Sequence, residues 1–82
     1  MPGRRAVGSP GTPETTVFLT LALGLRFETR FTSESKWWPA SVFEVAEAIL
    51  PYHHDAEACV ERMLNGEEVC SRLAVYRVAR RR

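Results

Sequence analysis

The chain has 82 residues, of which 45% are hydrophobic and 26% are charged, and its formal net charge is +1. This length suits one small domain, and this composition is ordinary for a globular protein. The longest apolar run, 17–25, is far shorter than the ~20 residues of a membrane-spanning helix, and two cysteines are too few for a disulfide scaffold. We therefore expect one folded domain with no membrane partner.

Charge is segregated along the chain despite the near-neutral total. Acidic residues dominate 32–71, whereas arginines dominate 1–31 and 72–82. Such a distribution makes a dipolar molecule in which neither sign prevails overall. Composition alone therefore assigns no nucleic-acid or membrane partner.

The first segment, 1–15, is rich in proline and glycine, which interrupt helices and strands, so we expect a flexible leader. An arginine pair followed by an apolar run with small residues also outlines a secretory signal, with cleavage near Gly24. We favour a cytoplasmic protein, because a removable leader would not need an alternating pattern that continues past Gly24. Export with a Cys59–Cys70 disulfide is the alternative.

Apolar residues recur at odd positions across 16–32, from Val17 to Phe31. A period of two is typical of a β-strand with one face against the core. One straight strand of this length, at about 3.3 Å per residue, would be too long for so small a domain. We therefore expect a strand bent at Gly24 or a hairpin turning there. The buried positions stay odd on both sides of Gly24, so a two-residue turn is disfavoured.

Two short helices are predicted in the acidic middle of the chain, after a polar loop. The first, 41–50, begins at a capping box formed by Ser41 and Glu44. The second, 55–65, begins at Asp55, a favoured helix cap. Each carries an apolar stripe, so both should pack on the same side of the sheet.

A closing strand is predicted at 69–79, followed by a basic tail at 80–82. Apolar residues occupy both odd and even positions of this strand, which indicates a central position in the sheet or cover on both of its faces. The predicted fold is α+β, a single domain over 16–79 with its helices on one face of the sheet. Its core would be thin, so we expect a homodimer or strand addition to a partner.

The run from His53 to Cys59 gathers five potential metal ligands: His53, His54, Asp55, Glu57 and Cys59. A structural metal site needs four ligands, and no second ligand pair has a recognised spacing. Cys59 lies on the apolar stripe of the predicted helix, where a small core residue is expected. We therefore predict no metal site, no cofactor and no catalytic group, and hence no enzyme.

Two adjacent tryptophans, Trp37 and Trp38, precede the first predicted helix. Neighbouring side chains of an extended segment point in opposite directions, so one should pack under the helix and the other near the surface. Exposed tryptophan is a favoured anchor for protein partners. The leading hypothesis is a non-enzymatic regulator or inhibitor that binds a protein through this loop or through an acidic helical face made of Glu44, Glu47, Glu57 and Glu61.

The alternative hypothesis is a nucleic-acid-binding domain. Arg26 and Arg30 should lie on the solvent face of the first β-segment, and Arg77 beside them on the closing strand. Phosphate contacts need a basic surface of this kind. The predicted site comprises Arg26, Arg30, Arg77, Arg80, Arg81 and Arg82.

Overall fold

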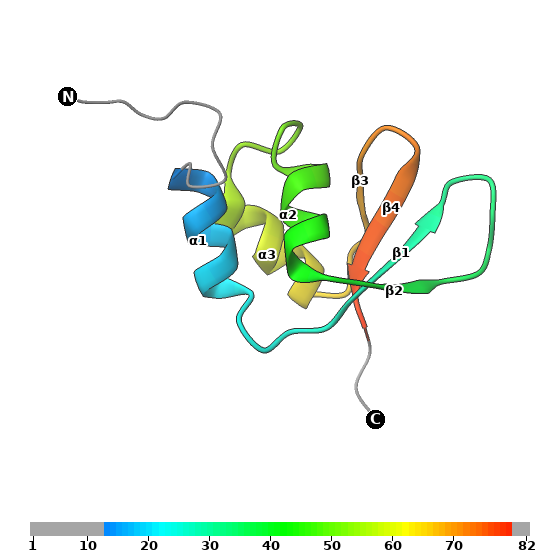
Figure 1. Ribbon diagram of the computed structural model, residues 1–82, viewed down its shortest axis with the longest axis horizontal. Coiled ribbons are helices and arrows are strands. Elements are labelled where there is room, and N and C mark those ends of the chain that lie inside the picture. Colours follow the sequence, from blue (N-terminus) through cyan, green and yellow to red (C-terminus); the bar gives the residue numbers. More distant parts are fainter. Residues whose placement is uncertain (1–12, 80–82) are drawn as a thin grey trace.

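The computed structural model describes residues 13–79. Three helices gather at one end of the molecule, and a four-stranded sheet extends from them (Figure 1). The elements in chain order are α1 (Pro13–Leu21), β1 (Phe27–Phe31), β2 (Trp38–Ala40), α2 (Val42–Ile49), α3 (Ala56–Leu64), β3 (Val69–Cys70) and β4 (Ala74–Val78). The predicted α+β class is confirmed. None of the helices in this described part is long and apolar enough to cross a membrane.

The first half of the predicted β-segment 16–32 is wrong, because Pro13–Leu21 is a helix. Phe18 and Ala22 are buried four residues apart, the spacing of one helical turn, and the leucines between them are not. Gly24 has φ +86°, a left-handed conformation that ends the helical segment instead of bending a strand. Only the second half of the prediction, 27–31, is a strand.

Helix α1 also overlaps the segment expected as a flexible leader. It begins at Pro13, a position that suits proline because the first helical N–H has no intrahelical partner. Residues 1–12 of that leader lie outside the described residues. Phe18 is fully buried, and its ring centroid lies 5.9 Å from that of Phe27. Cleavage near Gly24, the exported alternative, would remove this side chain from the core.

The two other helices lie where the local signals place them. The Ser41 hydroxyl accepts a hydrogen bond of 3.1 Å from the Glu44 amide, and the Asp55 carboxylate accepts one of 3.1 Å from the Ala58 amide. Each bond satisfies an amide that the helix itself leaves without a partner. Gly66, with φ +90°, follows the end of α3.

All strands of the sheet are antiparallel, in the order β2-β1-β4-β3. Strand β4 lies between β1 and β3, which confirms a central position for the closing strand. The predicted strand 69–79 is interrupted, because the Ser71 amide donates to the Ala74 carbonyl at 2.9 Å and closes a tight turn between β3 and β4. The expected polar loop before α2 also contains the short strand β2.

Strand register divides the sheet into an inner and an outer face. Phe27, Thr29 and Phe31 share the inner face with their partners on β4, because directly paired residues point to the same side. The sheet residues in the main core cluster, Phe27, Val69 and Tyr76, are all on this inner face, where the helices pack. The helices therefore pack on one face of the sheet, as predicted.

Candidate functional site

The outer face of the sheet carries a cluster of two arginines and one tryptophan. The Arg77 guanidinium carbon lies 3.8 Å from the centroid of the Trp37 ring, and that of Arg30 lies 5.2 Å from it. These distances are those of cation–π contacts. Beneath this layer Val75, on the same face, is buried although it does not belong to the main core cluster. Arg30, Trp37 and Arg77, the arginine–tryptophan cluster, thus form a small second layer on the outer face.

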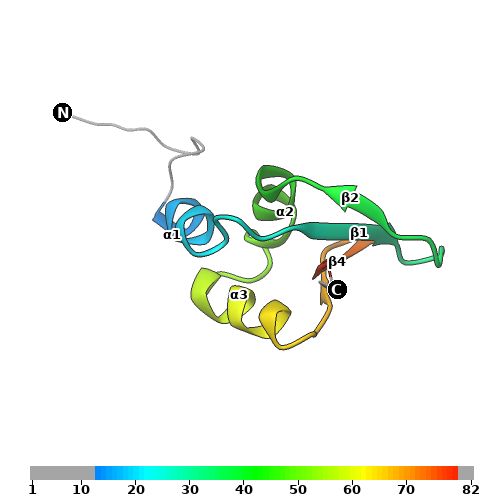
Figure 2. The ribbon, with the colours of Figure 1, turned by 90° about the horizontal axis from the view of Figure 1, so that it is seen from below.

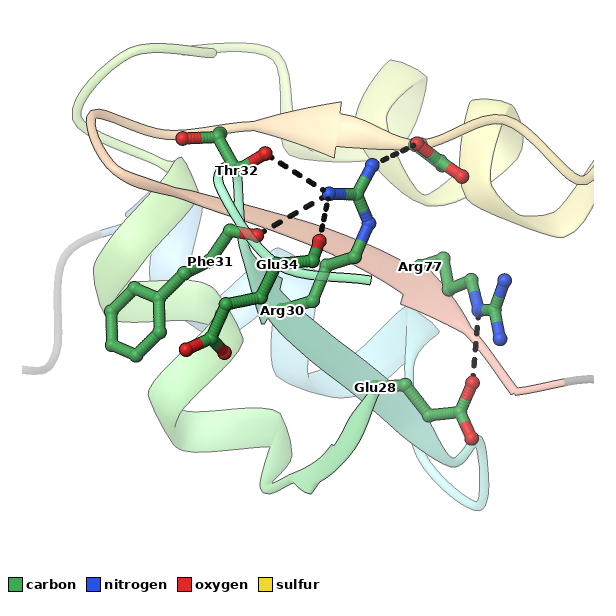
Figure 3. A network of polar contacts seen from close by, with 7 residues as sticks. Glu28, Arg30, Phe31, Thr32, Glu34 and Arg77 are labelled. Carbon is green, nitrogen blue, oxygen red and sulfur yellow. Dashed lines mark hydrogen bonds and ion pairs between the residues drawn. The ribbon is translucent and has the colours of Figure 1, made fainter. Parts of the chain in front are cut away.

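Arg30 holds the chain that follows β1. Its Nη1 donates hydrogen bonds to the carbonyls of Phe31, Thr32 and Glu34, at 3.3, 3.4 and 2.8 Å (Figure 3). Its Nη2 lies 3.7 Å from a carboxylate oxygen of Glu68. The guanidinium group of Arg30 is therefore bonded mainly to backbone carbonyls of the segment that follows β1.

Arg77 has a carboxylate partner of its own. Its Nε donates to Glu28 Oε1 at 2.9 Å, across two directly paired positions of β1 and β4 (Figure 3). The two arginines predicted for the solvent face do lie there together, but each is paired with a glutamate. The outer face is consequently close to neutral in charge, and it is less attractive to phosphate than the sequence suggests.

Of the other residues of the predicted nucleic-acid site, the structure describes only Arg26. Arg26 precedes β1 and is exposed, and its carbonyl accepts a hydrogen bond of 2.8 Å from the Ala79 amide. Arg80, Arg81 and Arg82 lie outside the described residues. The structure thus brings Arg30 and Arg77 together and places Arg26 beside Ala79.

The two tryptophans lie on opposite faces of the sheet. Trp37 packs on arginines of the outer face, so the prediction that one tryptophan lies under the helix is wrong. Trp38 pairs with Thr29 and lies on the inner face, where it is 49% exposed. The Lys36 ammonium nitrogen lies 4.3 Å from the centroid of the Trp38 ring.

The inner face is covered by helices over only part of its area. Along β1, exposure rises from 2% at Phe27 to 56% at Phe31, two residues of the same face. Trp38, which pairs with Thr29 on the same face, is 49% exposed. We call Phe31 and Trp38 the distal apolar surface. Sequence reasoning singled out only Trp38 of these two.

The four glutamates of the predicted acidic face fall into two pairs. Glu44 and Glu47 are exposed on α2, and Glu57 and Glu61 are exposed on α3. Figure 2 shows α3 below α2. Glu47 borders a shallow hollow that it shares with Arg72, whereas Glu57 borders a different one. The four glutamates are therefore divided between two helices.

The residues considered for metal binding and nucleophilic catalysis have structural contacts. His53 Nε2 lies 3.0 Å from the Cys70 carbonyl oxygen, a hydrogen bond that ties the loop before α3 to β3. The Cys59 thiol is buried and donates to the His53 carbonyl at 3.9 Å. Burial raises the pKa of Cys59, Arg62 partly opposes this increase, and Asp55 adds to it. Within residues 13–79 no group of three histidine, cysteine or acidic side chains could hold a metal ion.

The alternative Cys59–Cys70 disulfide is wrong. Both cysteines are free thiols, and Cys59 is buried whereas Cys70 is exposed.

Helix α3 also follows α2 through a turn, the order in which helix-turn-helix proteins present a recognition helix to DNA. In those proteins the first residues of the second helix contact base edges in the major groove. Here the cap is Asp55, the first turn carries Glu57, and the next turn exposes Glu61. Phosphates would repel these carboxylates, so α3 is unsuited to a DNA groove.

Comparisons with protein-family models, curated proteins and solved structures found no match. The functional proposal therefore rests on the residues of the two sheet faces.

Proposed function

We propose that this domain is a non-enzymatic protein-interaction module, a small regulator or inhibitor that binds a protein partner through the distal apolar surface. The observation that supports this proposal is the exposure of Phe31 and Trp38 where the inner face extends beyond the helices. The same face is a hydrophobic core at Phe27 and Tyr76. A partner that covered its open end would extend that core.

The aromatic residues of this surface have the chemistry of interface anchors. A large aromatic side chain can bury ~150–250 Å², so each half-exposed ring leaves roughly 100 Å² for a partner. Aromatic residues are enriched among the few positions that carry most of the binding energy of protein interfaces. The glutamates of α2, Glu44 and Glu47, are exposed on the helix that follows β2 and are available for a polar rim.

Two contacts support the non-enzymatic part of the proposal. His53, which contacts both cysteines, is hydrogen-bonded to the Cys70 carbonyl, and the Cys59 thiol is enclosed in the core. A nucleophile needs an accessible thiolate, whereas burial here favours the neutral thiol. A cytoplasmic location fits the proposal, because both thiols are free.

The test is affinity capture from a lysate of the source cells, with and without nuclease, by the full chain and two matched variants. Phe31→Ala alters the distal apolar surface. Leu64→Ala alters a side chain of matched exposure (55%, against 56% for Phe31) at the other end of β4, beside Val78 and Ala79. We expect nuclease-resistant capture of a protein that Phe31→Ala weakens and Leu64→Ala does not. Equal capture by both variants would refute the proposed surface.

A second candidate, nucleic-acid binding, is favoured by one observation. The Ala79 amide donates a hydrogen bond of 2.8 Å to the Arg26 carbonyl, so Arg26 lies beside Ala79, and Arg77 lies two residues before Ala79 in the chain. Phosphate contacts by these arginines would make the affinity fall steeply as salt concentration rises. Absence of retention on a generic oligonucleotide at low salt eliminates this candidate.

A further inference from the structure

We propose that Asn65 is a modification site, where attack of the Gly66 backbone nitrogen removes the side-chain amide, and that opening of the end of α3 controls this reaction. The site lies at the opposite end of β4 from the distal apolar surface. Asn65 and Gly66 share a hollow with Val78, whereas Phe31 pairs with Ala74. The inference goes beyond the proposed function and does not depend on it.

The Asn65–Gly66 pair is unique in this sequence. Asn65 is the only asparagine, the chain has no glutamine, and a glycine follows Asn65. Asparagine is a chemically labile residue. A following glycine hinders ring closure least, because it has no Cβ beside the attacking nitrogen. The Asn65 side chain is exposed and makes no hydrogen bond to a residue of the described part of the chain. Its amide group can therefore turn towards the backbone.

The reaction proceeds through a succinimide ring. The Gly66 nitrogen loses its proton to hydroxide and bonds to the side-chain carbonyl carbon of Asn65. The bond from that carbon to Nδ2 breaks, and the amide nitrogen takes up a proton and leaves as ammonia. Water then opens the ring at either carbonyl, which yields an aspartate or an isoaspartate. No oxidant or reductant takes part, and the ring-closing step is intramolecular.

The folded structure holds the attacking nitrogen away from its target. The ψ angle of Asn65 is 5°, so the Gly66 nitrogen is eclipsed with the Asn65 backbone nitrogen and is turned away from the Asn65 side chain. The Gly66 amide donates to the Met63 carbonyl at 3.0 Å, and the Glu67 amide donates to the Arg62 carbonyl at 3.0 Å. These two bonds form a Schellman motif, which ends a helix at a left-handed glycine. Arg62 Nε and Glu67 Oε1, 3.3 Å apart, close the same loop with an ion pair. Ring closure therefore requires this cap to open.

Opening of the cap is a local event. Helix ends open more easily than whole domains unfold. Each cap hydrogen bond favours the closed form by a factor of roughly 2 to 12, so the two bonds should slow the reaction roughly 5- to 150-fold relative to the unfolded chain. Global unfolding as the only route would slow it about 1,000-fold or more, given the stability of a domain of this length. The rate in the folded protein thus distinguishes the two routes.

The modification also changes the end of the helix. It adds a negative charge at the C-terminal end of α3, where the helix dipole is already negative. The carboxylate of Glu61, an exposed residue one turn earlier, adds like charge there. An isoaspartate lengthens the backbone between the partners of the cap hydrogen bonds. The modified cap should therefore open more readily than the original one.

The experiment follows the intact mass of the reduced full chain during incubation at mildly alkaline pH, both folded and unfolded in guanidinium chloride. Each modified molecule exchanges an NH₂ group for OH, and no other side chain of the sequence carries an amide. We expect the folded protein to react roughly 5- to 150-fold more slowly than the unfolded chain. Asn65→Gln should keep its mass over the same period, because its longer side chain would have to close a larger ring.

Two matched glycine variants separate cap opening from global unfolding. Gly66 has φ +90° and Gly24 has φ +86°, and an added Cβ would meet no described atom within 4 Å at either site beyond those of its chain neighbours. Each substitution by alanine therefore costs mainly backbone strain. We expect the ratio of folded to unfolded rates to rise about 5-fold in Gly66→Ala and to stay unchanged in Gly24→Ala. The ratio cancels any effect of alanine on ring closure itself.

Equal rates in the folded and unfolded chain would overturn the control by the cap. A folded rate about 1,000-fold below the unfolded one, or an equal rise in Gly24→Ala, would assign the reaction to global unfolding and overturn it as well. A gain in mass of Asn65→Gln at the wild-type rate would indicate direct hydrolysis and refute the attack by Gly66. None of these results depends on partner capture, so the inference and the proposed function can fail separately.

Discussion

Replacement of Phe18 by alanine tests the helix that sequence periodicity missed. Phe18 is the buried residue of α1, with no exposed surface, and its ring packs against Phe27 of β1. Truncation of a buried phenylalanine costs about 3–5 kcal/mol, from lost transfer energy and from the cavity left behind. At 0.05–0.15 kcal/mol per residue, a domain of this length has a total stability of only roughly 4–12 kcal/mol. We therefore expect Phe18→Ala to remove about a quarter or more of the free energy of unfolding.

Urea unfolding provides the measurement. Circular dichroism follows the helices, and tryptophan fluorescence follows the sheet, where both indoles are located. Coincident transitions would show that α1 unfolds together with the sheet. Val17→Ala is the matched control, because Val17 lies one position earlier in the same helix and is 43% exposed. We expect this control to change stability by less than about 1 kcal/mol.

The two variants distinguish the helix from the strand directly. A strand with the alternation predicted from the sequence would bury Val17, Leu19 and Leu21 and expose Phe18. Val17→Ala would then lower the free energy of unfolding more than Phe18→Ala. A loss of less than about 1 kcal/mol in Phe18→Ala would refute the packing of α1 described here.

Four further outcomes follow from individual contacts. In the folded protein Cys70 should react with a thiol reagent while Cys59 reacts only after denaturation, and equal rates would contradict the burial of Cys59. Because burial raises the pKa of Cys59 above its unfolded value, the thiol loses its proton at a lower pH in the unfolded state than in the folded state. The free energy of unfolding, measured by urea titration, should therefore fall as pH rises past about 8.5. The same measurement on Cys59→Ala should show a smaller decrease with pH. Arg30→Ala should cost about 1–3 kcal/mol and speed amide exchange in the neighbouring loop, whereas exposed Arg72→Ala should change stability by less than about 0.5 kcal/mol. Gly66→Ala should cost about 1 kcal/mol in thermal melting, since φ is +90° there, and an unchanged midpoint would rule out that conformation.

The helices that the sequence predicts well are those whose signals are local. The caps at Ser41 and Asp55 act on amides three residues away, so they can be read within one turn of chain. Segment 16–25 has no comparable capping signal. Nearly all its residues are apolar or small, so they fit the period of a helix as well as that of a strand. Leucine and alanine also have high helix propensity, which the alternation does not take into account. Gly24 was the available signal, as a residue that commonly ends helices.

The outer face could be predicted only in outline. Strand alternation correctly predicts that Arg30 lies on the solvent side and that adjacent tryptophans point in opposite directions. The ion pair between Glu28 and Arg77 joins residues 49 positions apart, and it depends on the pairing of β1 with β4. A short stretch of sequence does not reveal which strands pair in the sheet. The neutralisation of the basic face was therefore invisible before the structure.

The same contacts determine which face is better suited to a partner. A phosphate that bound Arg77 would have to compete with Glu28, whose carboxylate already accepts a hydrogen bond of 2.9 Å from that arginine. Breaking the pair would leave Glu28 without its partner and close to the phosphate, where like charges repel. A protein that covered Phe31 and Trp38 would displace water from apolar surface, which is favourable in itself, and the Lys36 ammonium group over the Trp38 ring is the one charge it would have to accommodate at these two side chains. The free-energy balance therefore favours the inner face as the contact surface.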